Sequence, residues 1–383
     1  MRHLWKTWVT KRTPDANDHR HMQAAFRLAR RGLGSVWPNP AVGCILVRED
    51  WGGRIVGRGW TQSGGRPHAE IEALSRAGEE ARGSTAYVTL EPCIHKGETG
   101  PCAEALIGAG ISRAVIALED PDPRVSGGGI KAIHDAGVDV VSGVLADAAA
   151  DLNAGFISRI TSGRPIFTFK TATSLDGRIA TASGHSHWIT GEDARRGAHY
   201  LRASHDALFI GSGTALQDQP KLTCRLPGMD QQSPVRVVAD SGLKLPINHP
   251  LVATAKAVPT WIYTVDGGDP DHRRELEAAG VLIINVDPDS QGRPDLNWVA
   301  ADMASRGLTR VLVEGGAELA TELLRRDLID RICWFRAPML IGGDGTPTVQ
   351  PLGVETLDEA AAFTRTSVCV MGADTIETYE RRN

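Results

Sequence analysis

The chain has 383 residues, of which 42% are hydrophobic and 23% charged, and its formal net charge is −4 at pH 7. At roughly 150 residues per domain this length predicts two domains, and the slightly acidic balance gives no support to a nucleic-acid partner. No apolar run approaches the roughly 20 residues that a bilayer crossing needs, so we expect no membrane association. Six cysteines scattered along the chain suit a reducing compartment, which predicts a cytoplasmic protein.

The first part of the chain alternates predicted helices and strands. Residues 1–17 are a charged tail without the apolar segment of a signal peptide. After them come a helix in DHRHMQAAFRLARRG, strands in AVGCILV and RIVGRGW, a helix from about 67 to 77, a strand over 85–90 and an αβαβ series to about 145. A connecting helix in DLNAGFISRITSGRP ends this part, so we expect one α/β domain over residues 18–162.

Residues 163–383 predict a second α/β domain. A strand in PIFTFKTATSLDG opens it, and helices such as EDARRGAHYLRAS and AELATELLRR alternate with six further strands. These strands are HDALFIG, VRVVAD, TWIYTV, VLIINV, RVLVEGG and DRICWFRA. The polar loop DQPKLTCRLPGMDQQSP lies between them, and a long loop inside a compact domain is more often functional than idle.

Two short motifs of the first domain carry chemistry. His68 and Glu70 in PHAE are two residues apart, a spacing that separates them by about 200° around a helix. Both side chains can still point into one shared site if they lie at the start of a helix, where Pro67 suits the first helical position. Cys93 follows the next strand in EPC, and Cys102 comes after eight intervening residues.

One imidazole and two thiolates give zinc three protein ligands and leave the fourth position to water, as in catalytic zinc sites. Zinc lowers the pKa of bound water to about 7, and Glu70 is placed to carry its proton to a leaving amine. HAE and EPC match the motif of zinc nucleobase deaminases except for the longer cysteine spacing. Each motif alone has an ordinary structural explanation: HxE is usually a solvent-exposed helix start, and EPC is usually a turn with a buried cysteine. We expect Glu72 to lie on the surface and Cys44 to lie in the core.

PNPAVG at 38–43, PHAE at 67–70, EPCIHKGETGPC at 91–102 and KTATSLDGRIA at 170–180 together resemble the RibD family of bifunctional riboflavin-biosynthesis deaminase-reductases. The resemblance covers nearly everything after the tail. It implies a cytidine-deaminase-like three-layer domain followed by a dihydrofolate-reductase-like α/β domain. The first would deaminate 2,5-diamino-6-(5-phosphoribosylamino)pyrimidin-4(3H)-one hydrolytically, and the second would use NADPH to reduce the ribosyl group to ribityl. Homo-oligomers are also implied.

The resemblance assigns roles to individual residues. The zinc ligands would be His68, Cys93 and Cys102, with Glu70 as the catalytic proton shuttle and Asn39 and His95 near the deaminase substrate. NADPH would be lined by Ala172, Trp188, Thr214, Asp218, Ser241, Gly316, Ala317, Glu318, Leu319, Ala320, Thr321 and Glu322. The aminouracil substrate of the reductase would be lined by Ser186, Arg202, Leu222, Arg225 and Glu314. Other roles are open for three of these: a turn for Asn39, core packing for Trp188 and a surface cation for Arg202.

The chain departs from the family's EPC segment at three positions, Ile94, Glu98 and Gly100. A basic residue at position 98 would attract the substrate phosphate, whereas the carboxylate of Glu98 repels it. Deaminase affinity therefore requires Lys96 or another cation in its place.

The reductase half also offers a phosphate cradle from its own pattern. RVLVEGGAELATELL predicts a strand, a Gly-Gly turn and a helix whose N-terminal N–H groups would bind phosphate. No GxGxxG follows a strand, which disfavours a Rossmann domain. Two alternatives remain: a deaminase of nucleic acids or nucleosides, and a zinc-stabilised scaffold with an inactive deaminase fold. The presence of Glu70 counts against the scaffold.

Overall fold

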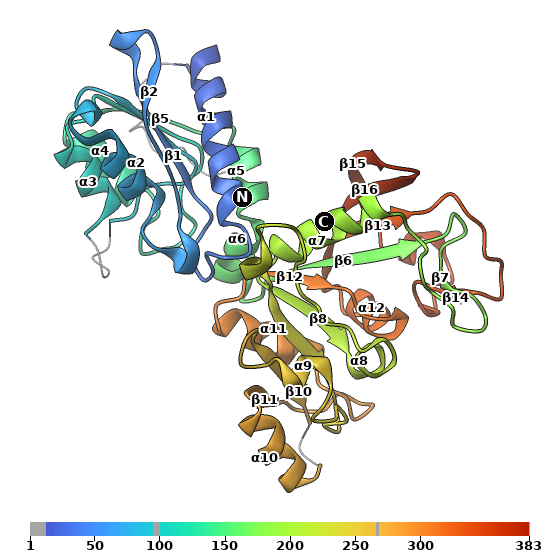
Figure 1. Cartoon of the computed structure of the whole chain (residues 1–383). Helices are drawn as coiled ribbons and strands as arrows, with labels where there is room; N and C mark the ends of the chain where they lie inside the picture. The colour runs from blue at the N-terminus through green and yellow to red at the C-terminus, as the bar shows by residue number, and fades with distance from the viewer. Residues whose placement is uncertain (1–12, 95–99, 266–267, 383) are drawn as a thin grey trace. The chain divides into compact units, whose positions relative to one another are not determined.

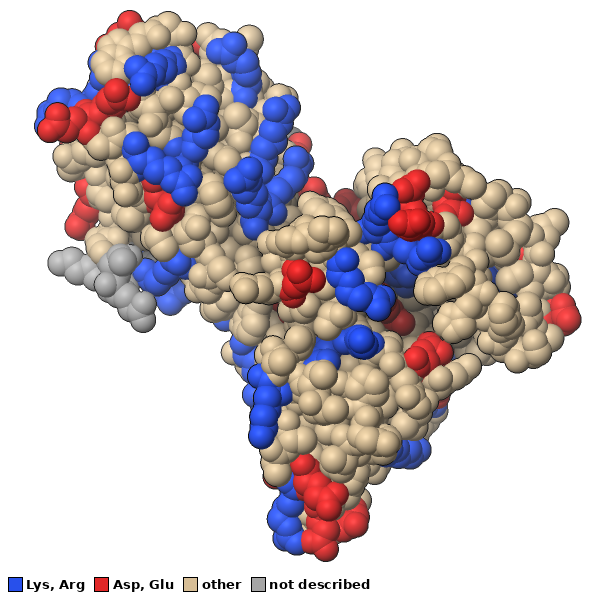
Figure 2. Space-filling view, in the orientation of Figure 1, with Lys and Arg blue, Asp and Glu red and all other residues tan. Residues whose placement is uncertain are grey.

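The computed structural model describes residues 13–94, 100–265 and 268–382 (Figure 1). The chain divides into two compact units, Met1–Ser162 and Gly163–Asn383. None of the helices in the described ranges combines the length and apolarity that a membrane crossing requires. Basic and acidic side chains are intermixed on the face that Figure 2 shows, and they touch one another in several places.

The N-terminal unit is built on one five-stranded sheet with the strand order β2-β1-β3-β4-β5. The β2, β1 and β3 strands are antiparallel neighbours, whereas β3, β4 and β5 run parallel. The strand bounds are β1 Gly43–Arg48, β2 Arg54–Trp60, β3 Thr85–Val88, β4 Arg113–Ile116 and β5 Asp139–Ser142. The parallel part places the ends of β3 and β4 on one edge, beside the segments that carry EPC and residues 119–127.

Helices cover both faces of this sheet. Cys44 and Leu46 of β1 pack with α2 (Ala69–Ala77), α3 (Cys102–Gly108) and α4 (Gly128–Asp135). Ile45 and Val47 face the opposite layer of α1 (Ala16–Ala29) and α5 (Ala146–Leu152). Alternate residues of one strand therefore enter two different cores, as the two-residue period of a strand requires. Cys44 is fully buried, as its apolar surroundings predict.

The expected elements of this unit are confirmed, with three corrections at helix ends. The first helix begins at Ala16, with Asp15 as its N-cap, so it includes the last two residues of the expected tail. Pro67 does not begin a helix: α2 begins at Ala69, and His68 is its N-cap with extended backbone. The single connecting helix expected in DLNAGFISRITSGRP is two helices, α5 and α6 (Ala154–Ser162). They meet at Asn153, whose buried amide accepts from the Ala41 N–H at 2.9 Å and donates to the Ala41 carbonyl at 3.2 Å.

The C-terminal unit has a nine-stranded sheet with the order β11-β10-β9-β8-β12-β6-β13-β16-β15. The strands from β11 to β13 are all parallel, and β16 and β15 extend the sheet in antiparallel fashion. Their bounds are β6 Ile166–Thr173, β8 Ala207–Gly211, β9 Val235–Ala239, β10 Thr260–Thr264, β11 Val281–Asn285, β12 Arg310–Val313, β13 Ile329–Arg336, β15 Phe363–Met371 and β16 Asp374–Arg381. Every strand expected from the sequence is present; the β15–β16 hairpin is additional.

Short elements and helices complete this unit. The β7 (Arg178–Ala180) and β14 (Thr346–Pro347) strands form a separate two-stranded sheet. The α7 helix (Glu192–Ala203) packs on Cys333 and Phe335 of β13, and α12 (Ala317–Arg325) follows β12. The remaining helices are α8 Ser212–Asp218, α9 Pro250–Ala253, α10 Pro270–Ala278 and α11 Leu296–Ser305.

Candidate active sites

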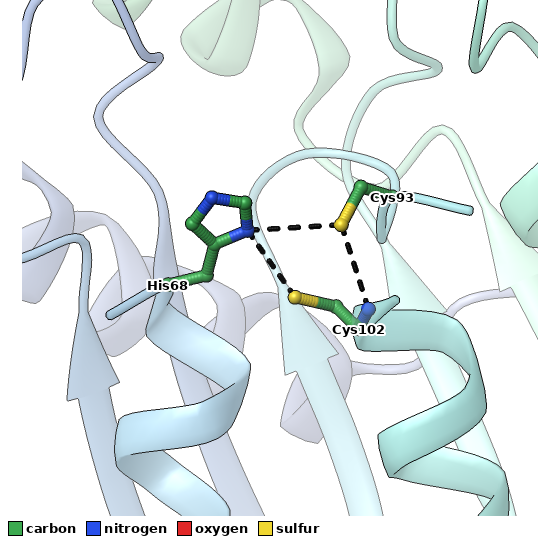
Figure 3. Close-up of side chains that lie close together, drawn as sticks. All are labelled: His68, Cys93 and Cys102. Carbon is green, nitrogen blue, oxygen red and sulfur yellow. Dashed lines mark hydrogen bonds between the residues drawn. The ribbon is translucent and has the colours of Figure 1, made fainter. Parts of the chain in front are cut away.

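The three expected zinc ligands converge in the N-terminal unit (Figure 3). The Nδ1 atom of His68 lies 3.3 Å from the Cys102 sulfur and 3.7 Å from the Cys93 sulfur. All three ligand atoms lie within 4.8 Å of one another. Tetrahedral zinc with usual bond lengths separates its nitrogen and sulfur ligands by about 3.5 Å, so this donor set fits zinc.

Local backbone packing brings the ligands together. The start of α2 lies so close to β2 that a Cβ atom at Gly59 would stand 2.0 Å from the Ala69 carbonyl oxygen, so only glycine fits there. This contact fixes His68 and Glu70 against the sheet. Cys102 begins α3, and its N–H donates to the Cys93 sulfur at 3.4 Å.

Glu70 lies in the first turn of α2 and is 3% exposed. Burial raises the pKa of its carboxyl to about 7. Hydrogen bonding from the Cys102 thiol lowers the pKa of Cys93 to about 4, and the same bond raises the pKa of Cys102. A buried carboxyl that titrates near neutrality beside a metal-binding trio suits proton transfer in a hydrolytic reaction.

A pocket opens above these side chains, and all of its walls come from the N-terminal unit. Asn39 lies on one wall, with Gly65 packed so closely that a Cβ atom there would overlap the Asn39 amide. Glu70 and the two ligands His68 and Cys93 also line it. The other lining residues are Pro38, Pro40, Val42, Thr61, Leu90, Glu91, Asp120, Asp122, Arg124, Val125, Phe156, Arg159 and Ile160.

Glu91 stabilises residues 120–130, which provide another part of the pocket lining. One of its carboxylate oxygens accepts from the Gly129 and Ile130 N–H groups at 2.8 and 3.0 Å, and the other from the Gly127 and Asp120 N–H groups at 2.9 and 3.1 Å. Glu91 is 3% exposed, and burial raises the pKa of its carboxyl. Through these hydrogen bonds, Glu91 connects residues 120–130 to the segment that carries Cys93.

This part of the pocket was not predicted from the sequence. Asp120, Asp122, Arg124 and Arg159 also line the pocket, and burial raises the pKa of Asp120 to about 6. The polar turn DPDPR between a strand and a helix was the available signal for the first three. His95, Lys96 and Glu98, which the sequence analysis singled out, lie outside the described residues.

In the C-terminal unit the expected reductase residues follow the carboxyl ends of adjacent parallel strands. Ala172 is near the end of β6, Thr214 follows β8, Ser241 follows β9, and Glu314 follows β12. These strands are consecutive in the sheet, in the order β9-β8-β12-β6. Ligands of open α/β sheets bind at this edge, so the topology gathers residues that are distant in sequence.

The start of α12 provides the expected phosphate cradle. Gly316 is the N-cap and has no side-chain cap, which leaves N–H groups of the first turn for an anion. Its own N–H donates to Thr214 Oγ1 at 2.9 Å and so joins α12 to α8. This uncapped terminus fits a dinucleotide phosphate.

The remaining positions assigned to NADPH are spread around this edge. Glu318 reaches outward to an ion pair with Arg293, whereas Thr321 is buried. Trp188 is 69% exposed, with the Arg195 guanidinium 4.4 Å from its ring centroid, which excludes core packing. Asp218 ends α8 and is exposed.

A charged cluster stands beside the cradle. Arg202 of α7 makes a bidentate ion pair with Glu314, at 2.6 and 2.9 Å, and donates to the Thr223 carbonyl. Burial would raise the pKa of Glu314, but Arg202 and then Lys170 hold it at about 2. Burial lowers the pKa of Lys170. Arg202 is therefore mostly buried, with 15% of its side chain exposed, and is not the surface cation that the sequence left open.

The other substrate positions divide into two groups. Arg225 lies beside His199 of α7, with its Nε atom 3.4 Å from the imidazole Nε2, and Leu222 is buried with a positive φ of 53°. Ser186 is exposed in the segment before α7. Among the described residues, no hydrogen bond or ion pair joins Ser186 to Arg202 or Arg225.

A zinc-binding deaminase unit followed by a nucleotide-dependent reductase unit defines a bifunctional pyrimidine deaminase and reductase. Residues 15–118 match the cytidine and deoxycytidylate deaminase zinc-binding region, and residues 165–376 match the RibD C-terminal domain. The chain belongs to the RibD family. Both fold expectations are thereby confirmed.

The relatives are similar over nearly their whole length. Riboflavin biosynthesis protein RibD of Bacillus amyloliquefaciens is 40% identical over 92% of this chain and 94% of its own, and that of Escherichia coli is 39% identical over 93% and 97%. Acinetobacter baumannii RibD is 35% identical with a TM-score of 0.84 over 96% of this chain and 99% of its own. A Thermotoga maritima diaminohydroxyphosphoribosylaminopyrimidine deaminase/5-amino-6-(5-phosphoribosylamino)uracil reductase is 31% identical, with a TM-score of 0.83 over 96% and 99%.

Proposed function

We propose that this RibD-family chain catalyses two reactions of riboflavin biosynthesis in succession. The first is hydrolytic deamination of 2,5-diamino-6-(5-phosphoribosylamino)pyrimidin-4(3H)-one, which releases ammonia. The second is the NADPH-dependent reduction of the ribosyl group of the resulting uracil to ribityl. The observation that carries this proposal is the convergence of His68, Cys93 and Cys102 next to buried Glu70, in one chain with a RibD reductase domain.

In the deaminase site His68, Cys93 and Cys102 would hold zinc, which supplies Lewis-acid activation of water when it is bound. Glu70 would carry a proton from the attacking water to the leaving amino group, a role that its buried position and pKa of about 7 support. The Asn39 amide can donate to and accept from a base edge, so we assign it to the pyrimidine. His95 would contact the substrate from the segment that follows EPC.

In the reductase site NADPH supplies the hydride when it is bound. The phosphates would lie on the N–H groups of α12 within Gly316–Glu322, with Ala172, Trp188, Thr214, Asp218 and Ser241 lining the rest of the cofactor. The substrate would lie against Ser186, Arg202, Leu222, Arg225 and Glu314. Arg225 can pair with its phosphate, and Glu314 can accept hydrogen bonds from its hydroxyl groups. Catalysis here is mainly positioning of the two reactants.

The proposal extends to the organisation of the chain. We assign residues 18–162 to the deaminase domain, 163–383 to the reductase domain and 1–17 to an N-terminal tail, although the last two residues of that tail already belong to α1. The six cysteines are all free, which supports a cytoplasmic location. A homo-oligomer is proposed through the reductase domain, where β15 is an exposed edge strand.

The test supplies purified protein with the diaminopyrimidine ribosyl phosphate and follows ammonia release and then NADPH oxidation in one tube. Both signals are expected in that order. Glu70→Gln keeps the shape of the side chain but cannot carry a proton, so ammonia release should fall by about 100-fold or more. Zinc content, measured by atomic absorption, should stay at that of the unaltered protein.

The reductase provides the control for Glu70→Gln. Supplied with the aminouracil, this variant should oxidise NADPH at the normal rate, because Glu70 lies in the other domain. Undiminished ammonia release by the variant would contradict the role of Glu70, and silence of the unaltered protein on both substrates would overturn the proposed function.

A further inference from the structure

The deaminase pocket has an uneven distribution of charge. Its described lining includes four carboxylates, those of Glu70, Glu91, Asp120 and Asp122. The permanent cations of the same lining are two arginines, Arg124 and Arg159. A doubly charged phosphate entering this pocket is repelled by the acidic wall and attracted to these two side chains.

We propose that Arg124 and Arg159 form the phosphate-binding site of the deaminase and take the place of a cation at position 98. The inference rests on the proposed deaminase activity and deepens it. The two side chains come from separate elements that line the same pocket, Arg124 from the wall held by Glu91 and Arg159 from α6.

Arg159 is directed to the pocket by the helix that carries it. Phe156, Arg159 and Ile160 all line the pocket, and the spacings of three and four residues put them on one face of α6. Phe156 is buried in the core that supports α2, so this face of the helix is fixed. Arg159 itself is only partly buried, which suits contact with the polar end of a ligand.

Arg124 is held in place by Asp122. Its Nε atom donates to the Asp122 carboxylate at 3.0 Å, its Nη2 atom pairs with the same group, and its backbone N–H also donates to Asp122 at 3.0 Å. The Nη1 atom takes no part in this pair, and the Arg124 side chain is 73% exposed. A guanidinium oriented on one edge retains donors on the other for a phosphate.

The burial of the lining residues supports an orientation of the substrate with its amine at Glu70 and its phosphate near the two arginines. Glu70 at 3% and Asp120 at 7% exposed lie deep, whereas Arg124 is exposed. The reacting amine must reach Glu70 and the metal-binding trio, so the phosphate at the other end of the substrate points toward the pocket mouth. Arg124, which is exposed, and Arg159, which is partly buried, are the cations of the lining that this phosphate can reach.

The experiment compares two substrates in each variant. Ammonia release is measured with the diaminopyrimidine ribosyl phosphate and with the same riboside after phosphatase treatment. In Arg124→Gln and in Arg159→Gln, the ratio of kcat/KM for the phosphorylated over the dephosphorylated substrate should fall by about 10- to 100-fold, the effect of losing one charged hydrogen bond. Arg124→Lys and Arg159→Lys, which keep the charge, should recover part of the ratio.

Arg58→Gln is the matched control, because Arg58 is an exposed arginine of β2 outside the pocket, and its ratio should not change. An unchanged kcat/KM for the dephosphorylated substrate verifies that the deaminase domain of each variant is folded. An unchanged ratio in both glutamine variants, or a loss confined to one of them or to Lys96→Gln, would overturn the two-arginine site. If the unaltered protein releases no ammonia, the proposed deaminase function itself fails.

Discussion

At the scale of single residues, the position of a helix start explains a spacing that looks wrong for a shared site. His68 and Glu70 would point to opposite sides of a regular helix. Because His68 is the N-cap, its backbone is extended, and only Glu70 follows the helical rotation. The sequence predicted that the pair lies at the start of a helix, but it placed Pro67 inside that helix, since proline is also common at the first helical position.

A residue outside both sites gives the clearest pH dependence. His205 is 2% exposed, its Nδ1 donates to the Leu201 carbonyl at 2.7 Å, and its Nε2 accepts from the Thr168 hydroxyl at 3.0 Å. Burial lowers the pKa of this imidazole from 6.5 to about 3. Below about pH 6.5 the His205 imidazole is protonated in the unfolded chain but stays neutral in the folded chain. The free energy of unfolding therefore decreases as the pH falls from 6.5 toward 3.

His205→Gln should remove this contribution. We expect the free energy of unfolding of the unaltered protein to fall by about 2 kcal/mol more than that of the variant between pH 7 and pH 5, measured by urea denaturation. His19→Gln alters an exposed histidine and should leave the pH dependence as it was. Equal pH slopes in His205→Gln and the unaltered protein would show that His205 does not titrate in this way.

At the scale of elements, the deaminase pocket depends on one carboxylate that joins two segments. Glu91 accepts four backbone N–H groups from residues 120–130, and Gly129 packs so tightly that a Cβ atom there would lie 2.0 Å from the Pro92 carbonyl oxygen. Glu91→Gln presents an amide NH₂ to donors, which leaves two of these N–H groups without an acceptor at about 1–3 kcal/mol each. The wall that carries Asp120 and Arg124 should loosen.

Two measurements check this prediction. Amide hydrogen exchange over residues 120–130 should accelerate by about tenfold or more in Glu91→Gln, and KM for ammonia release should rise more than kcat falls, with zinc content unchanged. Glu119→Gln, which changes an exposed carboxylate of the same segment, is the control. Protection of residues 120–130 equal to that in the unaltered protein would refute the role of Glu91.

Elements built from local signals were predictable, and contacts across long separations were not. The strands and helices of both domains follow from hydrophobic periodicity, and the zinc trio follows from two short motifs. The partners of Glu91 lie 29 to 39 residues further along the chain, so no local pattern shows them. The β15 strand was missed because most of its residues are exposed on both faces, which removes the alternation of apolar and polar positions that marks a strand.

At the scale of the whole molecule, the β15 edge strand of the nine-stranded sheet offers a surface for association with a second copy of the chain. The β15 strand is an edge strand of nine residues paired only with β16, and Val368 and Val370 are 51% and 73% exposed on one face. Cys369, Val370 and Met371 also line an apolar depression with exposed Tyr200 of α7. Edge strands with exposed apolar side chains associate unless something covers them, and a second copy offers the same surface in return.

The proposed homo-oligomer can therefore be tested at this edge. A charge at position 370 would be buried without a partner in such an interface, so Val370→Glu should weaken association by about 100-fold or more. Light scattering at micromolar concentration should then give the mass of one chain, 41.0 kDa, in place of a multiple of it. Val354→Glu changes another exposed valine of the reductase domain and should leave the mass of the assembly as it is. An oligomer that survives Val370→Glu would place the interface elsewhere, whereas a monomeric unaltered protein would remove the proposal, because the apolar edge would then stand uncovered in solution.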